Sequence, residues 1–145
     1  MTIAVLATDG SSSSVAAARR MLDPGVLAAP LSVHLVHVTP EITGRPRAWF
    51  TKDVLDQWLD ESAAQAFGEI LPIFLTAGIP VTEHRRYGEP ASEICEVAKA
   101  VQANLIVMGT HGRGAFFAAV MGSVASHVVA TARMPVLLVP RNAGG

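Results

Sequence analysis

Residues 105–123 read LIVMGTHGRGAFFAAVMGS, and this stretch decides the fold class. Leu105 to Met108 form a compact apolar run, which is typical of a strand buried on both faces of a sheet. The run leads directly into Gly109 and a glycine-rich segment that reaches Gly122, and residues 123–132 then predict a helix. A buried strand, a glycine-rich loop and a helix in this order indicate an α/β protein.

The rest of the chain repeats this alternation of strand and helix. Four further strands are expected at residues 3–7, 31–38, 81–87 and 136–139. Helical patterns cover residues 15–22, 49–75 and 91–100, and Pro72 predicts a kink or a break in the second of them. The alternation predicts one domain over residues 1–145, built on a parallel sheet with helices on both faces.

Composition narrows the class of protein. Half of the 145 residues are hydrophobic and 16% are charged, which excludes a disordered chain. The formal net charge of −1 lacks the basic character of a general nucleic-acid binder, although Arg45, Arg47 and Lys52 could form a local basic patch. The single cysteine cannot form an intramolecular disulfide, and no signal peptide or membrane span is evident. We therefore expect a soluble cytoplasmic protein with neither nucleic acid nor membrane as a partner.

The candidate site lies where three strands end. Ligands of parallel sheets bind beyond the carboxyl ends of the strands, at the point where the strand order reverses. Residues 7–10, 38–40 and 109–114 follow three of the expected strands and would converge there if the first and fourth strands are neighbours. The glycines at 109, 112 and 114 allow the backbone to approach a ligand. Gly122, Ser123 and Val124 begin a helix, whose free amides and dipole favour an anion.

These features predict a polyphosphate site, although the sequence matches neither of two well-known phosphate-binding loops. No Gly-Lys-Ser/Thr follows at the Walker spacing, and the glycines do not follow the first strand as in a dinucleotide fingerprint. Taken singly, each residue has a plainer interpretation. Gly109 and Gly112 could be turn glycines, and Ser123 or Asp9 could cap a helix. His34 and His37 lie on opposite faces of a strand and cannot chelate one ion together, and Cys95 is expected to be inert.

The spacing Gly-x2-Gly-x9-Gly-Ser resembles the ATP-binding branch of the universal stress protein family. Gly109, Gly112, Gly122 and Ser123 carry this motif. The resemblance extends over nearly the whole chain, through ATDGS at 7–11, LVHV at 35–38, GEPASEI at 88–94 and MPVLLVP at 134–140. The region from Thr39 to Phe50 varies in the family, and nothing is transferred to it.

The resemblance implies a Rossmann-like fold of the adenine nucleotide alpha hydrolase type. Its five-stranded parallel sheet has the order 3-2-1-4-5, and a homodimer forms through the last strand, here Val136 to Val139. Adenosine would lie at Ala7, Asp9 and Val38, with Asp9 near the ribose. The family's phosphate-site residues match, in this sequence, Gly109, Thr110, His111, Gly112, Arg113, Gly122, Ser123 and Val124. Mg²⁺ would bind through the phosphates, and no protein ligand for it is identified.

Several functions agree with this pattern. The leading hypothesis is an ATP-binding protein of stress response or signalling with at most slow hydrolysis, because no catalytic constellation is evident. A second hypothesis is a true ATPase in which Asp9 and His111 act in catalysis. AMP, ADP or cyclic AMP could replace ATP, because the glycine pattern does not separate these ligands. A dimeric interaction module without nucleotide, contacting a partner through the Trp49 loop, is the remaining alternative.

Overall fold

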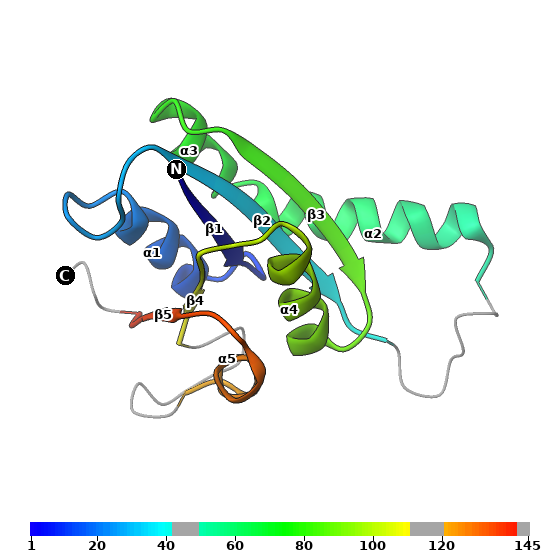
Figure 1. The fold of residues 1–145 in the computed structure, drawn as a ribbon. Helices are drawn as coiled ribbons and strands as arrows, with labels where there is room; N and C mark the ends of the chain where they lie inside the picture. The colour runs from blue at the N-terminus through cyan, green and yellow to red at the C-terminus, as the bar shows by residue number, and fades with distance from the viewer. Residues whose placement is uncertain (42–49, 111–120, 142–145) are drawn as a thin grey trace.

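A computed structural model of the chain describes residues 1–41, 50–110 and 121–141. Its strands are β1 (Thr2–Ala7), β2 (Leu31–Thr39), β3 (Val81–Tyr87), β4 (Leu105–Gly109) and β5 (Val136–Val139). Its helices are α1 (Ser12–Met21), α2 (Lys52–Phe67), α3 (Leu71–Thr76), α4 (Pro90–Ala100) and α5 (Ser123–Thr131). The strands form one parallel sheet in the order β3-β2-β1-β4-β5 (Figure 1), which confirms the expected fold class.

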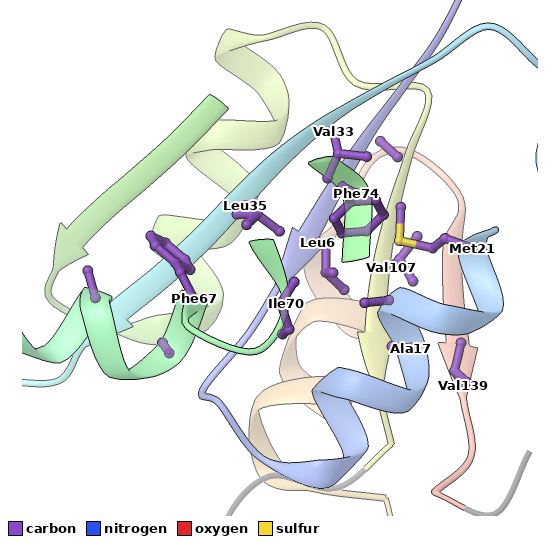
Figure 2. Packing of buried hydrophobic residues seen from close by; sticks show 14 residues of the cluster. Leu6, Ala17, Met21, Val33, Leu35, Phe67, Ile70, Phe74, Val107 and Val139 are labelled. Atoms are coloured by element: carbon purple, nitrogen blue, oxygen red, sulfur yellow. The ribbon is translucent and has the colours of Figure 1, made fainter. Parts of the chain in front are cut away.

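Helices cover both faces of the sheet, as the alternation of strand and helix predicts. On one face, Leu6 and Leu35 pack with Phe67, Ile70 and Phe74 beneath α1, α2 and α3 (Figure 2). On the other face, the neighbouring strand positions point toward α4 and α5, and Val5, Val36 and Ile106 join Ile94 and Val128 there. Because strand side chains alternate between faces, β1 contributes to both clusters, and residues 4–6 are fully buried.

The long helical pattern of residues 49–75 is two helices, with the break that Pro72 predicts. Helix α2 ends at Phe67 and α3 begins at Leu71, so Pro72 stands in the first turn of α3. A proline in the first turn does not remove a hydrogen bond of the helix, because the first backbone N–H groups of a helix have no acceptor within it. The expected start near Trp49 lies outside the described residues.

Gly109 lets β4 approach α1 closely. A methyl group at this position would overlap Ser13 Oγ and lie 2.8 Å from the Ser13 carbonyl oxygen. Ser13 is fully buried, so its helix has little room to retreat. This packing is a structural reason for glycine at position 109, and it is independent of any ligand.

Two histidines meet across the β2–β3 pair. His34 Nδ1 lies 2.8 Å from His84 Nε2, and the register that aligns Val36 with His84 places the two rings diagonally on one face. His37, as predicted, faces the other way and packs edge-on against Phe67 of α2. Burial lowers the pKa of His34 and His84, and for His84 the charges of His34 and Arg86 lower it further.

We expect Gly109→Ala to destabilise the fold by about 1–3 kcal/mol, the range for an extra methyl group in a well-packed core. Urea unfolding followed by circular dichroism measures the change. Gly68→Ala is the matched control, because Gly68 is exposed and has helical dihedral angles (φ −55°, ψ −42°). Equal stability of the two variants would contradict the close contact with Ser13.

We also expect the free energy of unfolding to fall as the pH drops below 6.5, the ordinary pKa of histidine. The unfolded chain then binds protons that the folded His34 and His84 resist, so the loss is complete only below their folded pKa values. Arg86, Glu93 and Glu96 face the same region, and they remain in a His34→Gln/His84→Gln variant. Urea unfolding between pH 5 and 8 should show a flatter pH dependence for this variant, and an unchanged dependence would refute the explanation.

Candidate functional site

A cleft of about 550 Å³ opens at the carboxyl ends of β1, β2 and β4. At this point the strand order reverses, because β2 lies on one side of β1 and β4 on the other. Loops that follow these neighbouring strands leave in opposite directions and leave a gap between them. The cleft therefore lies where the sequence predicts the site.

Eight of the predicted site residues line this cleft. They are Ala7, Asp9, Val38, Gly109, Thr110, Gly122, Ser123 and Val124. The other three, His111, Gly112 and Arg113, lie outside the described residues. The structure thus brings together segments that are more than one hundred residues apart in the chain.

The turn after β1 forms one wall of the cleft. Thr8 N–H donates to the Val36 carbonyl (2.9 Å) and thereby extends the β1–β2 ladder by one residue. Asp9 Oδ1 accepts hydrogen bonds from Ser11 N–H (2.9 Å) and Ser14 Oγ (3.1 Å). The cap of α1 is Ser11, whose side chain accepts from Ser14 N–H, so Asp9 shapes the turn that precedes the helix.

The start of α5 forms the opposite wall. Gly122 is the N-cap residue, and its N–H donates to the Thr110 carbonyl (2.6 Å), which ties the helix to the end of β4. Ser123, Val124 and Ala125 follow in the first turn and line the cleft. Their amides have no acceptor within the helix, and among the described residues no side chain caps it. These amides and the helix dipole make this wall suitable for an anion.

The cleft has an apolar part and a polar part. Apolar side chains from β1, β2, α4 and β4 line it, namely Ala7, Val36, Val38, Ile94 and Met108. Hydroxyl groups and backbone amides gather at Thr110 and the α5 start. No lysine or arginine lines the described part of the cleft, so backbone amides and hydroxyls are its anion-binding groups there. Such a division suits an amphipathic ligand with a flat apolar end and an anionic end.

Sequence reasoning placed Thr8 in a segment that reaches this wall but missed His37, which binds it there. His37 Nδ1–H donates to the Thr8 carbonyl (2.9 Å), and His37 Nε2 forms a hydrogen bond with the Ser62 hydroxyl of α2 (2.8 Å). A carbonyl oxygen only accepts, so Nδ1 carries a proton. Thr8 Oγ1 also donates to the Ala66 carbonyl (3.2 Å). The position of His37 near the end of a predicted strand was the only sequence signal for its place beside the cleft. Its partners Thr8 and Ser62 are distant in sequence and could not be predicted from it.

Glu89 links the two helices that flank the cleft on one side. It is the N-cap of α4 and accepts hydrogen bonds from Ser92 N–H (2.7 Å) and Ala91 N–H (3.3 Å). The hydrogen bond with the Ser92 side chain, followed by the one from the Ser92 N–H, lowers the pKa of the Glu89 carboxyl group. His127 Nδ1 of α5 lies 3.3 Å from the same carboxylate.

A second hollow, of about 630 Å³, lies over α2, α3 and β3. Its charged lining residues are Asp60, Glu83 and Arg85, and Asp60 and Arg85 form an ion pair with each other. No group of three or more metal-ligating side chains occurs within residues 1–41, 50–110 and 121–141. In the same ranges, no helix is both long and apolar enough to cross a membrane.

Solved structures share this fold. Hypothetical protein MJ0577 superposes with a TM-score of 0.80 at 27% identity, covering 95% of this chain and 94% of that one. An Arabidopsis thaliana universal stress protein family protein with AMP bound superposes at 0.71 with 19% identity, over 99% and 94% of the two chains. An Archaeoglobus fulgidus universal stress protein in complex with dAMP superposes with a TM-score of 0.60 at 24% identity, covering 95% of this chain and 96% of that one. A universal stress protein in complex with cAMP superposes at 0.59 with 23% identity, over 97% of each chain.

Sequence comparison assigns the family. A universal stress protein of Methanocaldococcus jannaschii is 31% identical over 141 residues, which are 94% of this chain and 81% of that protein. The family model described as "Universal stress protein family" matches residues 1–140. The chain therefore belongs to the universal stress protein family.

Proposed function

We propose that this protein binds an adenine nucleotide in the cleft and acts in stress response or signalling in the cytoplasm. The open first turn of α5, facing Asp9 across the cleft between β1 and β4, is the observation that carries the proposal. Three solved relatives of the same fold hold AMP, dAMP or cAMP, which all contain adenine. Their low identity shows the fold alone, so the ligand comes to this chain as a proposal.

The proposed pose follows the division of the cleft. The adenosine occupies the apolar part near Ala7 and Val38, and Asp9 faces the ribose. The phosphates occupy the wall formed by Gly109, Thr110 and residues 122–124, where amides and hydroxyls donate. We favour ATP over AMP, ADP or cyclic AMP, with Mg²⁺ held through the phosphates.

We propose binding and at most slow turnover. Asp9 and His37 are the titratable side chains on the described lining of the cleft. Both ring nitrogens of His37 are engaged by Thr8 and Ser62, so this ring has no free lone pair for an attacking water. Asp9 Oδ1 accepts from Ser11 N–H and Ser14 Oγ, which holds this carboxylate in the turn before α1.

Calorimetric titration of nucleotide-free protein with Mg-ATP, ADP, AMP and cyclic AMP tests the proposal. We expect saturable binding by the wild type and its loss in Gly122→Leu, because a leucine at the N-cap fills the phosphate end of the cleft. Gly68→Leu, an equal change at an exposed position outside the cleft, should bind like the wild type. Folded wild-type protein that releases no heat with any nucleotide would favour the nucleotide-free interaction module instead.

We further propose that the protein is a homodimer in which β5 pairs with β5 of a second copy. β5 pairs only with β4 in the described chain, so its outer edge is unprotected. The Pro135 and Val139 carbonyls accept from β4, and strand alternation then directs the Leu138 N–H outward. We expect a dimer by light scattering and a monomer for Leu138→Pro, which removes that outward donor. A monomeric wild type would overturn the proposal.

A further inference from the structure

The two histidines on the sheet's β2–β3 edge offer nitrogen ligands at one point, away from the cleft. His34 Nδ1 and His84 Nε2 are 2.8 Å apart, and their ring centroids are separated by 5.1 Å with a 36° tilt. Both side chains are partly exposed, so ions in solution can reach them. The pair stands on adjacent strands of a hydrogen-bonded sheet, which keeps the two backbones at a constant separation.

The spacing of the two nitrogens is close to that of two ligands on one metal ion. With bonds of about 2.0–2.1 Å to imidazole, two ligands at a right angle are about 2.9 Å apart, and two tetrahedral ligands are about 3.3 Å apart. The 2.8 Å contact is an N–H···N hydrogen bond in which one ring donates to the other, and this distance is close to the separation of two ligands at a right angle, as in square-planar or octahedral ions. A metal ion would replace the shared proton, and both rings would rotate so that their lone pairs point at the ion.

The charges around the pair also permit a cation. The positive charge of Arg86 acts on His84, and Arg86 Nη2 binds Glu93 Oε2 (2.9 Å) and Glu96 Oε2 (3.1 Å) of α4. These carboxylates compensate the guanidinium and leave one negative charge in excess among the three side chains.

We propose that His34 Nδ1 and His84 Nε2 together bind a divalent transition-metal ion with right-angled ligands, namely Cu²⁺ or Ni²⁺, with water in its remaining positions. The ion joins the edge strand β3 to β2 and stabilises the folded chain, because the unfolded chain does not hold the two rings together. The site is independent of the proposed nucleotide cleft, whose lining contains neither histidine.

Titration of tag-free protein with Cu²⁺, followed by calorimetry and electron paramagnetic resonance, tests the site. We expect hyperfine structure from two imidazole nitrogens in the wild type and a higher melting temperature with the metal. His34→Gln and His84→Gln should each weaken binding at least tenfold, because loss of an outer-shell partner alone costs about 10- to 100-fold. His127→Gln is the matched control, since His127 is an exposed histidine on α5 that pairs with Glu89.

Melting curves without metal establish that each variant folds, and the nitrogen count on the wild type does not depend on any variant. Retention of wild-type affinity by either single variant would overturn the paired site. Co²⁺ should give the weak visible absorption of an octahedral ion, and the intense absorption of a tetrahedral one would overturn the assigned geometry. Cu²⁺ binding that is unaffected in the double variant would place the ion elsewhere and refute the proposal.

Discussion

The burial of residues 4–6 of β1 on both faces of the sheet is the constraint on which the rest of this structure depends. Residues 4–6 are shielded on both faces, and β2 and β4 pair with both edges of the strand. Such a strand requires apolar side chains at successive positions and helices on each side. It also requires that the chain leave the sheet where β2 and β4 diverge. The cleft is the consequence, because the turn at Thr8 and Asp9 cannot fill the gap between two loops that depart in opposite directions.

The same crowding explains why the site is made of backbone groups. Gly109 stands so close to Ser13 that a side chain cannot be accommodated, and Gly122 is joined to the Thr110 carbonyl. Amides held in this way keep their direction without a ligand, which reduces the entropy that binding must overcome. A site of this kind binds an anion through geometry, whereas a lysine would have to be ordered first. Glycine at position 109 therefore allows α1 to pack against β4, and it adds no side chain to the wall of the cleft.

The sequence predicted most of the fold because its signals are local. Apolar runs located the strands, Pro72 marked the break between α2 and α3, and the glycine spacing pointed to the cleft wall that the structure builds from Gly109 and Gly122. Contacts between distant elements could not be predicted in this way. The Ser62–His37 bond joins residues 25 positions apart and the His34–His84 contact joins residues 50 apart, and both depend on strand register and helix rotation. The sequence assigned glycine at 109 to ligand approach, and only the packing of α1 reveals its second reason.

The alternation of side chains along β2 places its two histidines in different environments. His34 and His37 are three residues apart, so the pleat directs their rings to opposite faces. His37 faces α2 and connects Ser62 to the Thr8 carbonyl, and it thereby holds the cleft wall against that helix. His34 faces the α4 side and meets His84 near Arg86, where carboxylates of α4 balance the charge. A change of one residue in the β2 register would turn both rings to the opposite faces and place Val36 or Val38 where His37 now meets Phe67. The separation of the cleft from the proposed metal site thus depends on the same burial that sets the register of β1 with β2.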